Sequence, residues 1–158
     1  MNTVTAAHIH LLLCHAPIMA ILFAFVLLII GLWRGNSEDQ KIALATIVAA
    51  AVLTLPLYLT GKPASGAVKG LPGFVDTILE RHQTVAALAL AGCSLLGVIA
   101  LAGLLLFRDR TPARWFGITM LFATVIVGLI LIWTANLGGQ IRHPEIRPAT
   151  FEVPKDSR

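Results

Sequence analysis

The sequence has 158 residues, of which 57% are hydrophobic and only 13% are charged. Soluble globular domains carry about 25% charged residues, so this composition excludes a water-soluble surface and indicates an integral membrane protein. The net charge is +4, but the basic residues lie between apolar runs, where they fix orientation in a membrane rather than bind a polyanion. We therefore expect a lipid bilayer around the chain and no nucleic-acid partner.

Four apolar runs follow one another along the chain. They cover residues 9–33, 42–60, 84–107 and 115–137. Each is long enough to cross a hydrocarbon core of about 30 Å, and spanning segments must satisfy their own backbone hydrogen bonds, which favours helices. The sequence thus predicts an all-α, four-helix membrane bundle forming one domain over residues 1–158. An outer loop at 61–83 and a C-terminal tail at 138–158 complete it.

The orientation follows from the basic residues. The two short loops, 34–41 and 108–114, are dense in Arg and Lys, whereas no basic residue precedes the first span. The opposite side has more basic residues in total, but they are spread over longer segments. The positive-inside rule then makes the short loops cytoplasmic. We expect a multi-pass protein of the bacterial inner membrane with both termini in the periplasm.

All five histidines fall on the predicted periplasmic side, because an even number of spans returns the chain to it. They are His8, His10, His15, His82 and His143. Ionisable residues at membrane depth mark functional sites, and a neutral imidazole binds metal ions and haem iron. His15 and His82 belong to different spans and are the first predicted pair of haem ligands. His10 and His143 form the second, so one or two haem b groups are predicted.

Several other residues have both a cofactor interpretation and a plainer one. Arg81 either forms a bidentate pair with a haem propionate or is an interfacial charge. Tyr58 and Lys62 either anchor the chain at the interface or contact propionates or a quinone. Gly138 and Gly139 either end the fourth helix or let the backbone approach a cofactor.

Two local features also leave alternatives open. Pro17 either kinks the first helix beside His15 or occupies a first helical turn, where proline is tolerated. Small residues in the second and third spans, including Ala89, Cys93 and Gly97, either make room for a haem or simply allow close helix packing.

The segment His10-Leu-Leu-Leu-Cys-His15-Ala-Pro-Ile resembles the His-Pro-x-x-Val-His-Phe-Pro-Ile opening of a bacterial family of predicted four-helix membrane proteins of unknown function. The chain departs from that pattern at Leu11, where the family has proline, and at Ala16, where it has an aromatic residue. Further matching features are Thr60-Gly61, His82, Gly138-Gly139 and His143. The resemblance covers nearly the whole chain and implies a four-helix membrane fold, but no activity.

The leading functional hypothesis is a b-type cytochrome subunit that transfers electrons between the quinone pool and a periplasmic cytochrome or other redox partner. It would act with other subunits of a membrane redox complex rather than as an enzyme, since no acid–base pair or nucleophile triad is evident. The first alternative is a copper or other metal site, and helical spacing splits its candidate donors between two faces. One face has His8, His15 and Met19, and the other has His10 and Cys14. The second alternative is a structural subunit without a cofactor.

Overall fold

The computed structural model describes residues 5–148, and its regular structure there is entirely helical. The elements in chain order are α1 (Ala6–Leu13), α2 (Ala16–Arg34), α3 (Ser37–Ser65), α4 (Asp76–Leu106), α5 (Arg114–Arg142) and the 3-10 helix η1 (Pro144–Ile146). Because α1 and α2 together form one segment, four segments are long and apolar enough to cross a membrane. The predicted all-α, four-helix membrane bundle is confirmed.

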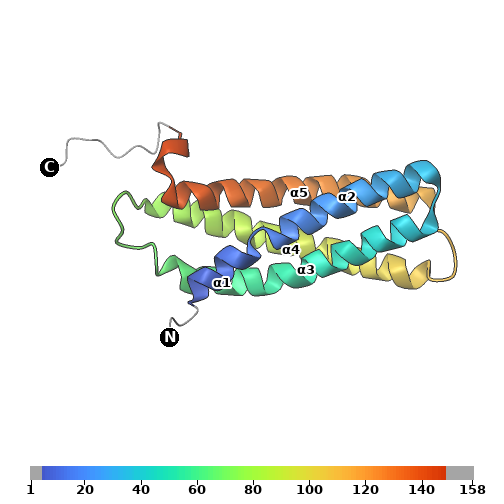
Figure 1. Ribbon diagram of the computed structural model, residues 1–158, viewed down its shortest axis with the longest axis horizontal. Helices are drawn as coiled ribbons and strands as arrows, with labels where there is room; N and C mark the ends of the chain where they lie inside the picture. Colours follow the sequence, from blue (N-terminus) through green and yellow to red (C-terminus); the bar gives the residue numbers. More distant parts are fainter. Residues whose placement is uncertain (1–4, 149–158) are drawn as a thin grey trace.

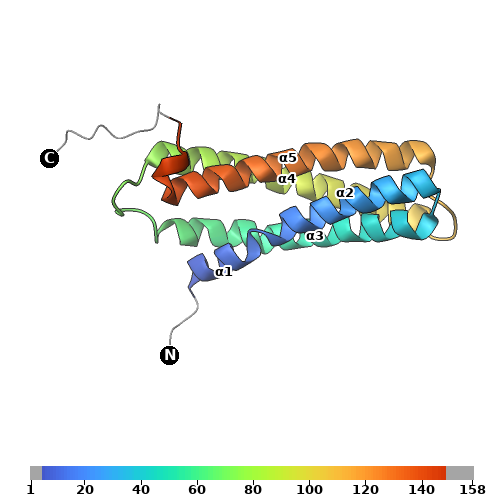
Figure 2. The same ribbon diagram turned by 45° about the horizontal axis from the view of Figure 1, so that its top comes forward.

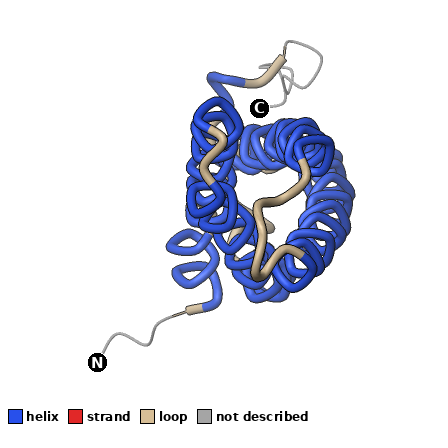
Figure 3. Tube along the Cα trace, turned by 90° about the vertical axis from the view of Figure 1, so that its right-hand side faces the viewer, coloured by secondary structure: helices blue, strands red, loops and turns tan. Residues whose placement is uncertain are grey.

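The four segments lie side by side along the long axis of the molecule (Figure 1). Helix α2 packs against α3 and α5, and α4 also packs against α3 and α5, so the segments surround a common axis (Figure 3). Between 22% and 33% of the residues in each apolar window are buried. Most of the apolar side chains therefore face outward, as they do in a helix surrounded by lipid.

Both ends of the described chain lie at the same end of the bundle as the segment 66–75, which connects α3 to α4 (Figure 1). We call this the termini end. Arg147 holds it together, because its guanidinium donates to the carbonyls of Gln140 (2.7 Å), Ile141 (3.0 Å) and Gly73 (2.7 Å). The last of these bonds ties the end of the bundle to the α3–α4 connection.

The helices extend further than the apolar runs predicted. Helix α3 continues to Ser65, α4 already begins at Asp76, and α5 ends at Arg142. The predicted outer loop 61–83 therefore shrinks to 66–75, and the predicted tail 138–158 begins with helical residues. Hydropathy marks only the part of a helix in hydrocarbon, whereas helical hydrogen bonding continues into the polar interface. Residues 149–158 of that tail lie outside the described residues.

The first membrane segment is broken between α1 and α2. Pro17 lies in the first turn of α2 and has no N–H to donate to the Leu13 carbonyl, so α1 ends at Leu13 and a new helix begins at Ala16. Both interpretations of Pro17 hold, because it lies in the first turn of α2 and the membrane segment changes direction beside His15. The break directs α1 along α3, on which it packs (Figure 2).

The small residues of α3 and α4 serve mainly close packing. A Cβ atom added to Gly97 would overlap the Cβ atom of Ala51 on α3, and Cys93 is buried in the core one turn earlier. Ala89, a further turn along, lines the cavity described below. These small residues therefore bring α3 and α4 together, and only Ala89, the one nearest the termini end, lines a cavity.

We predict that Gly97→Ala destabilises the bundle, because overfilling a packed contact costs about 1–3 kcal/mol. Gly92→Ala, in the same helix, is the matched control, since its new Cβ would lie an ordinary 3.4 Å from the Val127 Cγ2 atom. Unfolding of both variants in mixed detergent micelles measures the difference. Equal stabilities would show that α3 and α4 do not approach as closely as described.

Candidate functional site

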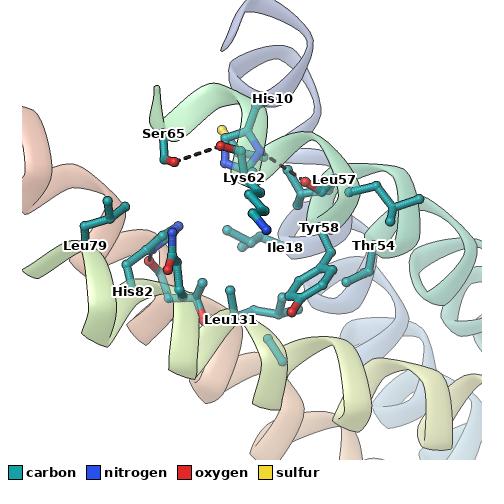
Figure 4. Close-up of a pocket in the computed structure, with 18 of the residues that line it drawn as sticks. His10, Ile18, Thr54, Leu57, Tyr58, Lys62, Ser65, Leu79, His82 and Leu131 are labelled. Atoms are coloured by element: carbon teal, nitrogen blue, oxygen red, sulfur yellow. Dashed lines mark hydrogen bonds between the residues drawn. The ribbon is translucent and has the colours of Figure 1, made fainter. Parts of the chain in front are cut away.

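A cavity of about 760 Å³ opens at the termini end, between residues of all four membrane segments (Figure 4). This volume lies within the range of roughly 300–1,000 Å³ typical of small-molecule sites. Its walls are largely apolar and include Ile18, Leu57, Leu79 and Leu131. Among the residues to which the sequence analysis gives a cofactor role, it is lined by His10, His82, Tyr58 and Lys62.

His10 reaches the cavity from α1 and is fixed by α3. Its Nδ1 atom lies 3.1 Å from the Leu57 carbonyl oxygen and 3.2 Å from Thr60 Oγ1. A carbonyl oxygen only accepts hydrogen bonds, so the ring donates its Nδ1–H to Leu57. A neutral His10 then carries its lone pair on Nε2, the atom that binds a metal.

His82, on α4, is fixed in the same way by a hydrogen bond to α5. Its Nδ1 atom lies 3.0 Å from the Thr134 carbonyl oxygen on α5, so this ring also donates Nδ1–H and leaves Nε2 as the lone-pair nitrogen when neutral. The ring rests over Gly138, where an added Cβ would lie 3.2 Å from the His82 Cε1 atom.

The two histidine arrangements repeat one another. Each ring donates to the carbonyl four residues before a glycine of the next membrane segment, Leu57 before Gly61 and Thr134 before Gly138. An added Cβ on Gly61 would lie 3.4 Å from the His10 Cε1 atom, so both glycines let an imidazole lie against helical backbone. No repeat stands out in the sequence, because few residue types recur and the histidine-to-carbonyl separations differ, 47 and 52 residues.

Gly138 thus has a role that neither interpretation of the sequence described. It does not end the helix, because α5 continues to Arg142, and the group that approaches it is the His82 ring. The expectation of a helix C-cap at Gly138 and Gly139 was wrong. Glycine pairs usually mark helix ends, and the ring from α4 that requires Gly138 is invisible in the local sequence.

The structure does not bring the predicted pair His15 and His82 together. His15 is exposed, lies at the break before α2, and has its Nδ1 atom 3.1 Å from Cys14 Sγ. His10 and Cys14 line the cavity, whereas His15 does not. The sequence prediction chose His15 as a ligand because it lies deeper along the helix. Which side chain lines the cavity depends on the helix face, and His10 is the histidine on that face.

The second predicted pair, His10 and His143, is also separated. His143 follows the end of α5, where its Nδ1 atom lies 2.9 Å from Glu145 Oε1 and both side chains are exposed. A hydrogen bond from its own backbone N–H, followed by the bond to His143, holds the pKa of Glu145 below its ordinary value. Arg81 and Gly139 likewise do not line the cavity.

One cavity residue of clear chemical interest is missing from the sequence prediction. Lys69 lines the cavity together with Tyr58, Lys62 and Ser65. Tyr58, Lys62 and Ser65 share one face of α3, which continues past the predicted end of the second span at residue 60, whereas Lys69 lies in the connection after that helix. Helical spacing therefore gave no basis for expecting Lys69 at the cavity.

Comparisons with protein-family models, with curated proteins and with solved structures found no match for this chain. Its function must therefore be inferred from the residues of the cavity.

We predict that Gly138→Val pushes the His82 ring out of place and breaks its hydrogen bond to Thr134, because a larger side chain occupies the space of the imidazole. Gly139→Val is the control, since an added Cβ there meets only Ile146 Cδ1 at 3.5 Å. Nitrogen-15 NMR of histidine-labelled protein reports the proton on His82 Nδ1. The prediction fails if both variants keep the wild-type His82 signal.

Proposed function

We propose that the cavity binds one haem b, with His10 and His82 as its two axial ligands. The observation that carries this proposal is the pair of imidazoles from α1 and α4 lining one cavity, each donating Nδ1–H to a backbone carbonyl. Histidines that bind metals characteristically donate their other ring N–H in this way, which fixes the tautomer and the ring orientation.

The donor set favours haem over a bare metal ion. A porphyrin supplies four nitrogen ligands of its own, so two protein ligands complete the coordination of its iron. A bare copper or zinc ion usually takes three or four protein donors, and the part of the chain that the structure describes has no group of three His, Cys, Asp or Glu side chains placed to share an ion. His15 and Met19 are exposed away from the cavity, which further disfavours the predicted copper site.

The cavity also suits the body of a haem. Its volume of about 760 Å³ and its apolar walls match a large, flat, hydrophobic cofactor. Since the second histidine pair is not assembled, we propose a single haem rather than two.

A haem with two histidine ligands has no open position for a substrate, which suits electron transfer. The cavity lies at the termini end, which the distribution of basic residues makes periplasmic in a bacterial inner membrane. We propose that the protein is a b-type cytochrome subunit, with a membrane quinol as electron donor and a periplasmic redox protein as acceptor. Membership of the four-helix family that the histidine motif resembles is part of this proposal.

We predict that the full-length protein, purified in mild detergent from cells supplied with haem, shows a Soret band and about one haem per chain by the pyridine haemochrome assay. His10→Ala and His82→Ala each remove an axial ligand and should lose most of the haem. His15→Ala and His143→Ala are the matched controls and should keep it.

Helical content measured by circular dichroism distinguishes ligand loss from misfolding in these variants. Absence of haem from the folded wild-type protein would contradict the proposal and favour a structural subunit. Full haem retention in the folded His10→Ala, His82→Ala double variant would contradict the ligand assignment.

A further inference from the structure

We propose that Lys62 and Lys69 bind the acidic groups of the cofactor, so that the two propionates of the haem point toward the membrane surface at the termini end. This inference rests on the proposed haem site and adds an orientation and a recognition element to it. The two lysines would act as positioning residues for the cofactor, not as iron ligands.

The side chains that line the cavity carry positive charge. Two lysines line it, and no aspartate or glutamate among residues 5–148 does. Figure 4 shows the Lys62 side chain extending into the cavity rather than away from it. Both lysines are exposed, so they place two positive charges beside largely apolar walls and favour a ligand whose apolar body carries negative charge at one edge.

The lysines also have no acidic partner within residues 5–148. The ion pairs found there join Lys41 to Glu38, Arg108 to Asp109 and His143 to Glu145. No hydrogen bond from the Nζ atom of either lysine is found in that part of the chain, whereas Lys41 Nζ donates to the Arg108 carbonyl at 3.0 Å. Both ammonium groups therefore remain available to a ligand.

The order of residues along α3 supplies the orientation. Moving toward the termini end, the cavity is lined successively by Thr54, Tyr58, Lys62, Ser65 and, beyond the helix, Lys69. The deep part is formed by apolar residues such as Ile18, Ala89 and Leu131, so polarity and positive charge rise toward the mouth. An apolar ring with carboxylates along one edge matches that gradient, whereas an uncharged quinone offers the two lysines hydrogen-bond acceptors but no opposite charge.

The test compares haem with its dimethyl ester, which has the same iron and ring but no carboxylates. The full-length apoprotein in detergent is titrated with each form and followed at the Soret band. For haem, Lys62→Gln and Lys69→Gln should each weaken binding about tenfold, the effect of losing one charge-assisted hydrogen bond. For the dimethyl ester, the same variants should bind like the wild type.

Arg142→Gln is the matched control, because it removes one positive charge at the same end without lining this cavity. It should bind both forms like the wild type. Equal wild-type affinity for haem and its ester, or equal losses for both forms in the lysine variants, would overturn the lysine assignment while leaving the haem site standing. Failure of the wild type to bind either form would contradict the haem site itself, and the lysine assignment with it.

Discussion

The placement of the two histidines at the cavity depends on one kind of interaction, the hydrogen bond from a histidine Nδ1–H to a backbone carbonyl of the next membrane segment. Within a bilayer no water replaces a lost bond of this kind, so each bond fixes both the ring and the helix that carries it. The bond from His10 joins α1 to α3, and the bond from His82 joins α4 to α5. The glycine against which each ring lies makes the approach possible, and both rings line the cavity.

The break at Pro17 makes the first of these bonds possible. Helix α2 packs against both α3 and α5, whereas α1 packs on α3, so the segment changes direction where the proline interrupts its hydrogen bonds. This change places His10 against Leu57 and contributes Cys14 and Ile18 to the cavity wall. A feature that disrupts a helix thereby builds one side of the site.

The number and type of the helices could be predicted from the sequence because a bilayer tolerates few alternatives to long apolar helices. The concentration of histidines at one end followed from counting the spans. The choice between His10 and His15 could not be predicted, since it depends on how the helix turns around its axis on either side of a break. The role of Gly138 was equally hidden, because it depends on a ring from another helix. Lys69 lies in the connection between α3 and α4, where no helical periodicity predicts which side chains line a cavity.

The central claim is that two histidines from different membrane segments bind one haem iron between them. Electron paramagnetic resonance of the oxidised, full-length protein tests this most directly, because it reports the spin state and the axial ligands of the iron. We expect a low-spin, six-coordinate ferric haem with two imidazole ligands, which His10→Ala and His82→Ala each convert to a high-spin or haem-free form. A high-spin, five-coordinate haem in the wild type, or an unchanged low-spin signal in both variants, would contradict it.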